Sequence, residues 1–322
     1  MVKQFSWTKF AWNTWCVSSL IGIWPRFLEP YSLATSHLRL PIPNLPSDLN
    51  GLRILQFSDL HLQSNFPQWY LNKISKRINA LKPDMIVFTG DFLNYAQLEQ
   101  PERLTSFLKS LSARYGCYAI LGNHDYAQYV STNEAGDYDL GDAQTSFIKR
   151  GFRRLFSPPI HLSKKVTARA KNVGLHALLT ELLEKTSFTL LHNETSLVPV
   201  KDSFLNLTGL GEHILGRCLP SQAFQNYNSS FPGIVLVHNP DAVSSLYSYP
   251  GELILCGHSH GYQINLPWLR HKLTALENKE LARGLFQAHN KWIYVNRGIG
   301  GTMTFRWFSI PELSLFTLEA QS

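Results

Sequence analysis

The sequence has few cysteines, and no two of them form a close pair. Cys16, Cys117, Cys218 and Cys256 lie far apart in a chain of 322 residues. Small disulfide-stapled secreted domains and CxxC metal sites both need cysteines at short spacing, so the sequence favours neither class. Reduced thiols in a chain long enough to bury a sizeable core are typical of a cytosolic protein.

The sequence also lacks a long apolar run. Its most apolar stretch, residues 15–24, is interrupted by Ser18, Ser19 and Gly22 and is too short to predict a transmembrane helix. No Ala-x-Ala-like cleavage site of a signal peptide follows it. We find no internal repeat, no low-complexity tract and no Pro/Gly/Ser-rich linker, so a division into several domains is not indicated.

Acidic residues are missing from the first 28 positions, where the charged residues are Lys3, Lys9 and Arg26 and where four of the eight tryptophans occur. Tryptophan and basic residues without acids are typical of a helix that lies in the membrane interface. A helix packed on the protein's own core would explain the same composition. We therefore interpret residues 1–35 as a membrane-interface segment, with packing on the domain as the alternative.

A second acid-free stretch covers residues 149–171 and contains eight lysines and arginines interleaved with apolar side chains. The formal net charge of +7 likewise favours anionic partners. The stretch lies in an irregular region at about 130–185 that we interpret as a lid-like insert. Its cations could meet phosphates or lipid headgroups, or they could be merely solvated. No recognised nucleic-acid-binding module accompanies it, so a nucleic-acid partner is not expected.

Short apolar runs alternate with helical periodicity along the rest of the chain, a pattern typical of a layered α/β fold. Helices are expected at about 68–81, 102–111 and 174–185. Buried strands are expected at 53–57, 85–89, 117–121, 234–237 and 253–256.

A polar candidate ligand follows the carboxyl end of each of these five strands, which is the edge where open α/β sheets bind ligands. The residues fall into five motifs: Asp59-Leu60-His61, Gly90-Asp91, Gly122-Asn123-His124-Asp125, His238, and Gly257-His258-Ser259-His260. Each motif alone is weak. Five of them in order, each after an expected strand, predict one shared site.

Together these motifs resemble the calcineurin-like metallophosphoesterase superfamily over roughly residues 52–310. The resemblance implies a four-layer α/β/β/α sandwich over residues 36–322 and a site for two divalent metal ions, with Mn²⁺ expected and Fe or Zn²⁺ as alternatives. Carried over by position, the ligands of one ion are Asp59, His61 and His260, those of the other are Asn123, His238 and His258, and Asp91 bridges both.

The resemblance also implies that His124 faces the substrate, stabilising the transition state or protonating the leaving group, and that Asp125 orients His124. Two metal ions would neutralise an anionic phosphate and lower the pKa of a water between them. Because the whole ligand set is present, a non-catalytic interaction module is a weak alternative.

Further stretches, such as residues 294–301 and the closing Pro311-Glu312-Leu313, resemble a membrane-associated bacterial branch of the superfamily. That branch includes enzymes that hydrolyse the pyrophosphate of UDP-2,3-diacylglucosamine to UMP and 2,3-diacylglucosamine 1-phosphate in lipid A synthesis. The resemblance implies a peripheral enzyme, expected to be a monomer, on the cytoplasmic face of the inner membrane. The alternative is a phosphodiesterase acting on another phospholipid, a cyclic nucleotide or nucleic acid.

For a lipid-linked nucleotide substrate, the insert and the C-terminal stretch supply candidate contacts. Cations would meet phosphate, while aromatic side chains would cover acyl chains. The candidates are Arg150, Phe152, Arg153, Arg154, Phe156 and Arg297.

Overall fold

The computed structural model describes residues 6–141, 161–270 and 275–321. The N-terminal helices are α1 (Trp7–Ser18), the π-helix η1 (Ser19–Leu28) and the 3₁₀ turn η2 (Glu29–Tyr31). The later helices are η3 (Ser47–Leu49), α2 (Gln68–Ala80), α3 (Pro101–Lys109), α5 (Ala168–Lys171), α6 (Ala177–Glu184), α7 (Pro220–Ala223), η4 (Pro240–Leu246) and η5 (His260–Tyr262).

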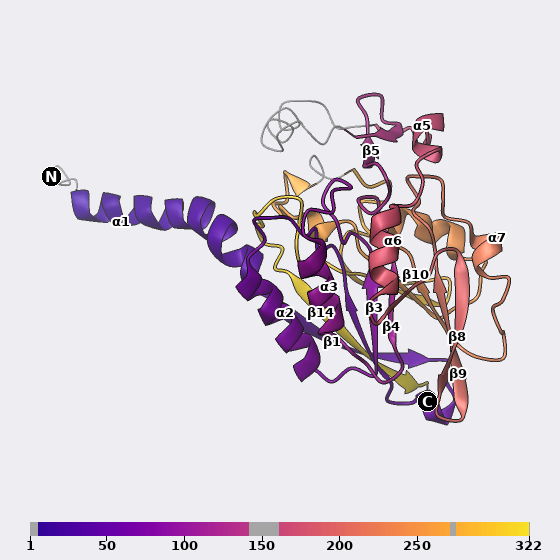
Figure 1. Cartoon of the computed structure of the whole chain (residues 1–322). Helices are drawn as coiled ribbons and strands as arrows, with labels where there is room; N and C mark the ends of the chain where they lie inside the picture. The colour runs from indigo at the N-terminus through magenta and orange to yellow at the C-terminus, as the bar shows by residue number, and fades with distance from the viewer. Residues whose placement is uncertain (1–5, 142–160, 271–274, 322) are drawn as a thin grey trace.

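Two six-stranded sheets lie at the centre of the fold (Figure 1). The first has the order β1-β14-β2-β3-β4-β7. Its strands are β1 (Ala34–Ile42), β14 (Glu312–Ala320), β2 (Arg53–Phe57), β3 (Met85–Thr89), β4 (Cys117–Ile120) and β7 (Phe188–Leu190). The second has the order β12-β13-β11-β10-β9-β8. Its strands are β12 (Gly284–Ala288), β13 (Lys291–Val295), β11 (Leu253–Cys256), β10 (Gly233–Leu236), β9 (Ser203–Gly209) and β8 (Glu194–Val200).

The sheets pack face to face because alternate side chains of each strand point to opposite faces. In β10, Ile234 and Leu236 join the core between the sheets, whereas Val235 lies in the cluster on the outer face. In β11, Leu253 and Leu255 point inward and Ile254 points outward. Strands that are covered on both faces need continuous apolar runs, which is the pattern expected from the sequence.

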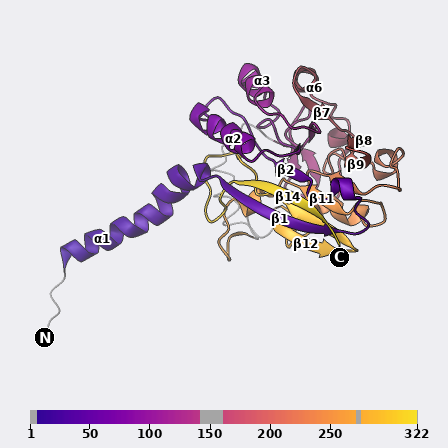
Figure 2. The ribbon, with the colours of Figure 1, turned by 90° about the horizontal axis from the view of Figure 1, so that it is seen from below.

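Helices cover the two outer faces. The helices α2, α3 and α6 lie over the first sheet (Figure 2) and share one apolar cluster with β2, β3 and β4. The short helices η4 and α7 contribute to the cluster on the outer face of the second sheet. The expected four-layer α/β/β/α arrangement is therefore confirmed, with a thin outer layer over the second sheet.

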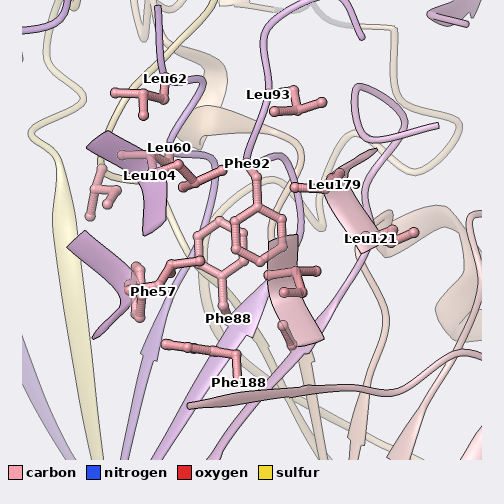
Figure 3. Close-up of a cluster of buried hydrophobic side chains, with 14 of the residues drawn as sticks. Phe57, Leu60, Leu62, Phe88, Phe92, Leu93, Leu104, Leu121, Leu179 and Phe188 are labelled. Atoms are coloured by element: carbon pink, nitrogen blue, oxygen red, sulfur yellow. The ribbon is translucent and has the colours of Figure 1, made fainter. Parts of the chain in front are cut away.

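The cluster beneath the first sheet's loops is rich in aromatic side chains (Figure 3). The ring centroids of Phe57 and Phe88 lie 4.8 Å apart, and those of Phe88 and Phe92 lie 4.0 Å apart. Leu60 and Phe92 follow Asp59 and Asp91 directly in the sequence and are fully buried. The packed core therefore fixes the chain on either side of these two carboxylates.

The expected strands and helices match the observed ones to within a few residues. The strands at 53–57, 85–89 and 253–256 are confirmed at both ends, while β4 and β10 each end one residue earlier than expected. The largest difference is at α6, where the expected start at Gly174 falls three residues early, because the side chain of His176 caps the helix by accepting a hydrogen bond from Leu179 N–H.

The described part of the insert is more ordered than a loop. Strands β5 (Val130–Thr132) and β6 (Tyr138–Leu140) form a small antiparallel pair, and α6 packs Leu179, Leu182 and Leu183 into the core against the first sheet. The candidate contacts Arg150, Phe152, Arg153, Arg154 and Phe156 lie outside the described residues. The lid-like role of the insert therefore stays a prediction.

The N-terminal helix extends away from the body of the protein (Figures 1 and 2). None of the residues of α1 is buried, and Trp7, Trp12 and Trp15 are 74%, 67% and 60% exposed. The alternative that this helix packs on the protein's own core is therefore wrong for α1. Among the described residues, no helix combines the length and apolarity that a membrane span needs.

We predict that Phe88→Ala lowers the free energy of unfolding by about 3–5 kcal/mol, because it opens a cavity beneath the ligand-bearing loops. Leu178→Ala, at an exposed position of α6, should change it by no more than about 0.5 kcal/mol. Urea unfolding of the metal-free protein measures both. Equal losses would contradict this description of the core.

Candidate metal centre

Strands from both sheets deliver polar residues to one edge. The strands β2, β3 and β4 run parallel, as do β10 and β11, so the carboxyl ends within each sheet point the same way. Asp59 and His61 follow β2, Asp91 follows β3, and Asn123 and His124 follow β4. His238 follows β10, and His258 and His260 follow β11. The two sheets thus meet at a single cluster of side chains.

The first group in this cluster consists of Asp59, His61, Asp91 and His260, all buried, with ligand atoms within 4.8 Å of one another. His61 Nε2 lies 3.1 Å from His260 Nε2 and 3.4 Å from Asp91 Oδ2. His260 Nε2 lies 3.5 Å from Asp59 Oδ1. Two carboxylates and two imidazoles therefore face one small volume.

The second group consists of Asp91, His238 and His258. His238 Nε2 lies 3.2 Å from Asp91 Oδ2 and 3.3 Å from His258 Nδ1. Asn123 joins this group, because its Oδ1 lies 3.1 Å from His258 Nδ1 while its Nδ2 donates to Val130 O. The amide oxygen of Asn123 therefore points at the group.

Asp91 belongs to both groups, which is the position expected for a bridging ligand. Burial alone would raise the pKa of this carboxyl, but the neighbouring His238, His124 and His61 hold it well below its usual range. By contrast, burial raises the pKa of Asp59 to about 7, and Asp91 adds to this effect. Of these two carboxyls, Asp91 is therefore the one held most firmly in its charged form.

Most imidazoles of the cluster are held neutral, which is the form that binds metal. Burial lowers the pKa of His61 to about 4 and that of His258 to about 3, and it holds the pKa of His260 well below its usual range. His238 differs: burial acts to lower its pKa, but the charge of Asp91 outweighs burial and raises it well above normal. His238 thus offsets the charge of Asp91, whose Oδ2 lies 3.2 Å from its Nε2.

Backbone carbonyls set the orientation of two imidazoles. His61 Nδ1 lies 3.1 Å from Leu93 O, and His238 Nδ1 lies 2.7 Å from Thr89 O. In the neutral ring, the proton on Nδ1 donates to the carbonyl and leaves the lone pair of Nε2 directed at the cluster. Both Nε2 atoms are those that face Asp91.

His124 lies beside the cluster with a different orientation. Tyr95 N–H donates to His124 Nδ1 over 2.9 Å, so the neutral ring carries its proton on Nε2. Burial keeps the pKa of His124 well below its usual range. The rings of Tyr95 and Tyr129 flank it, with centroids 5.3 and 4.4 Å away. His124 can therefore donate one hydrogen bond from Nε2.

The expected role of Asp125 requires correction. Instead of bonding to the ring of His124, its carboxylate accepts the backbone N–H groups of Asp91 (2.7 Å), Leu93 (2.9 Å) and Gly122 (3.0 Å). A short carboxylate that lies among three backbone donors is satisfied by them. Asp125 thus holds the loop that carries Asp91, and Tyr95 orients His124.

The backbone around the cluster is strained. Asp59, His61, Asp91, His258 and His260 all have φ between 46° and 70°, the left-handed region that costs energy for residues with a Cβ. Among the described glycines, Gly122 makes the closest approach to the side chain of a candidate ligand: a Cβ there would lie 2.3 Å from Asp91 Oδ1 and 2.7 Å from His238 Nε2. Such strain persists only where surrounding packing enforces it, and it is typical of functional sites.

Of the candidate substrate contacts, Arg297 is the one that the structure describes. Its Nε donates to Glu312 Oε2 over 3.0 Å, and it lines a hollow of about 500 Å³ between β1 and β12. Sequence reasoning missed Tyr95, Tyr129 and the carbonyls of Leu93 and Thr89. Tyr95 and Tyr129 lie within a few residues of the motifs, but their aromatic side chains carry no spacing signal that distinguishes them from core residues.

The donor set fits divalent metal ions. Imidazole nitrogen with carboxylate and amide oxygen suits Mn²⁺, Fe and Zn²⁺, and the sharing of Asp91 suits two ions side by side. His260 Nδ1 is buried without a hydrogen-bond partner among the described residues. His61 Nε2 and His260 Nε2 lie close together, and a cation bound by both nitrogens would offset the repulsion between their lone pairs.

Comparison with known proteins agrees with this geometry. Residues 52–262 match the family model of the calcineurin-like phosphoesterases. The chain is 42% identical to a UDP-2,3-diacylglucosamine pyrophosphatase, LpxG, of Chlamydia trachomatis, and the match covers 92% of each chain. It is 28% identical to the uncharacterized metallophosphoesterase YkuE of Bacillus subtilis, over 92% of this chain and 88% of that one. It is 26% identical to the phosphodiesterase YaeI of Escherichia coli, over 83% and 82%.

We predict that Gly122→Ala weakens metal binding by about 10–100-fold, the range found when the immediate supports of metal ligands are lost, because the new methyl group displaces Asp91 and His238. Gly174→Ala is the matched control, since a Cβ there meets nothing within 4 Å. Mn²⁺ titration by calorimetry measures both variants. Wild-type affinity in Gly122→Ala would contradict the described geometry.

Proposed function

The chain belongs to the calcineurin-like phosphoesterase family, and from this premise we propose that it hydrolyses the pyrophosphate bond of UDP-2,3-diacylglucosamine. The products are UMP and 2,3-diacylglucosamine 1-phosphate. The observation that carries the proposal is the similarity, along nearly the whole chain, to an enzyme named for this reaction. The buried ligand cluster supports it, because pyrophosphate hydrolysis requires neutralisation of a doubly charged group.

Two divalent ions, with Mn²⁺ as the first candidate, would occupy the two groups. Asp59, His61 and His260 would hold one ion, Asn123, His238 and His258 would hold the other, and Asp91 would be shared. Bound there, the ions supply charge neutralisation at the phosphate and a water of lowered pKa as the nucleophile. The protein supplies fixed ligand positions, since the rings of His61 and His238 are held by backbone carbonyls.

His124 acts on the substrate rather than on the ions. As a neutral ring with its proton on Nε2, it can donate a hydrogen bond to a phosphoryl oxygen and give its proton to the leaving phosphate. Tyr95 and Tyr129 hold the ring on either side and limit its movement. Asp125 contributes indirectly, by fixing the backbone of the Asp91 loop.

Because the proposed substrate carries acyl chains, we propose that the enzyme works at a membrane surface, the cytoplasmic face of the bacterial inner membrane. Residues 1–35 would lie in the interface, which is consistent with the exposed tryptophans of α1. Trp268 and Phe308 add exposed aromatic surface, and Arg26 at the base of the helix donates to Thr304 O in the same loop as Phe308. The basic insert is a further candidate contact. A bound lipid surface needs no helix that spans it.

A second candidate function is hydrolysis of a phosphodiester in another lipid, a cyclic nucleotide or nucleic acid. It uses the same ligands and His124. The relative that is named a phosphodiesterase favours it, although that relative is less similar to this chain. The two candidates differ in substrate but agree in mechanism.

We predict that the purified protein with Mn²⁺ releases UMP from UDP-2,3-diacylglucosamine in detergent and that EDTA abolishes this release. Asp91→Ala should lower the rate of UMP release by more than the roughly 10–100-fold that is typical when a residue supporting a metal ligand is replaced, because both ion sites lose a ligand. Bis(p-nitrophenyl) phosphate, cyclic nucleotides and single-stranded DNA serve as comparison substrates. No UMP above background, with turnover of a diester, would replace the first candidate by the second.

We predict that replacing both Trp12 and Trp15 by Ser weakens binding to phosphatidylethanolamine/phosphatidylglycerol vesicles by about tenfold or more, since burial of one large apolar side chain is worth about 1.5–3 kcal/mol. Leu178→Ser is the control, because Leu178 is equally exposed (63%) but lies on α6. Vesicle co-sedimentation measures binding. Equal binding by the tryptophan variant and the wild type would contradict an interfacial role for α1.

A further inference from the structure

A buried carboxylate marks the point where the N-terminal helices join the body of the protein. Glu29, at the start of η2, is completely buried. Its Oε2 accepts a hydrogen bond from Trp24 Nε1 over 2.6 Å, and its Oε1 accepts one from Ser309 N–H. Each carboxylate oxygen therefore has its own donor, one from the helix and one from a loop 280 residues away in the sequence.

The loop that carries Ser309, residues 300–309, is clamped by the same helix end. Arg306 N–H donates to Pro25 O over 2.9 Å, and Arg26 Nη1 donates to Thr304 O over 2.6 Å. The side chain of Arg306 is also buried, and it donates to Ser309 O (2.9 Å) and Gly300 O (2.6 Å). The guanidinium thus ties both ends of the loop together.

The clamped loop holds the backbone of two candidate ligands. Ser309 Oγ donates to His260 O over 2.7 Å and lies 3.1 Å from Gly261 O. Gly300 N–H donates to Asp59 O over 2.8 Å. Asp59 and His260 both belong to the first group, which would hold one of the two proposed ions. In the second group, Asn123 Nδ2 donates to Val130 O and His238 O accepts from Gly257 N–H, while His258 N–H donates to Asp59 Oδ1 over 3.0 Å.

We infer that Glu29, Arg306 and Ser309 are positioning residues for the ion of the Asp59–His61–His260 group, so that seating of the N-terminal helix sets the affinity of this one ion. The inference rests on the proposed two-ion site. His260 sits in the left-handed region at φ 50°, so its turn needs outside support to persist. The hydroxyl of Ser309 provides that support, and Glu29 fixes Ser309.

Glu29→Gln tests the link with minimal change of shape. Glutamine has one acceptor oxygen, so it can accept from Ser309 N–H or from Trp24 Nε1, and its NH₂ group must then face a second buried donor. The loop end should shift, and His260 with it. Ser309→Ala tests the last step alone, since it removes the hydroxyl that bonds to His260 O.

We predict that both variants bind one Mn²⁺ with wild-type affinity and the other about 10–100-fold more weakly, as for other changes that act through a metal ligand's immediate support. Calorimetric titration of the full chain measures the two affinities, and elemental analysis after dialysis measures the number of ions that stay bound. After dialysis, two ions per chain should fall to about one. Excess Mn²⁺ should restore the kcat for UMP release.

Glu252→Gln is the matched control, because Glu252 Oε2 also accepts a backbone N–H, from Gly233 over 2.6 Å, at the opposite end of β11 from the cluster. It should keep both ions while losing some stability. The inference is overturned if Glu29→Gln and Ser309→Ala lose stability but bind both ions like the wild type, or if both ions weaken equally.

Failure of the proposed function is a separate outcome. If the wild type binds two Mn²⁺ but releases no UMP, the substrate assignment fails, and the selective loss of one ion in the variants still decides the inference. If the wild type binds fewer than two ions, the two-ion site and the inference are overturned together.

Discussion

The burial of one carboxylate between two groups of imidazoles is the constraint on which the rest of the structure depends. Asp91 Oδ2 lies 3.4 Å from His61 Nε2 and 3.2 Å from His238 Nε2. His61 lies on a loop of the first sheet, and His238 lies on a loop of the second. To bring these groups together, the two sheets must face each other with their carboxyl ends at one edge. The left-handed backbone at five ligand positions and the glycine at position 122 follow from the same crowding. The apolar layers beneath hold this strained edge in place.

The same edge connects the metal centre to the N-terminal helix. The tryptophans of α1 are exposed and α1 carries no acidic residue. The helices that follow it, η1 and η2, form a buried network with residues 300–309 through Trp24 and Glu29. A lipid-linked nucleotide has one part that belongs in a membrane and another that must reach the ions. In this arrangement, the helical segment that continues from α1 is hydrogen-bonded through residues 300–309 to the backbone of Asp59 and His260.

The layered fold and the ligand cluster could be predicted from the sequence because their signals are local. Each buried strand is a short apolar run, and its ligand follows within a few residues. The role of Asp125 could not be predicted, because its three backbone partners depend on how two loops pack. The burial of Glu29 could not be predicted either, because its partner Ser309 lies 280 positions away in the sequence. Whether the N-terminal helix packs on the core likewise depends on tertiary contacts that composition does not encode, and the interfacial role stays a prediction.

The central claim is that one buried carboxylate is shared by two metal ions. Anomalous diffraction at the manganese edge, from crystals of the full chain grown with Mn²⁺, tests it most directly. The account predicts two peaks about 3.5–4 Å apart, with Asp91 between them, one beside His61 and His260 and the other beside His238 and His258. A single peak, or two peaks of which only one contacts Asp91, would contradict it.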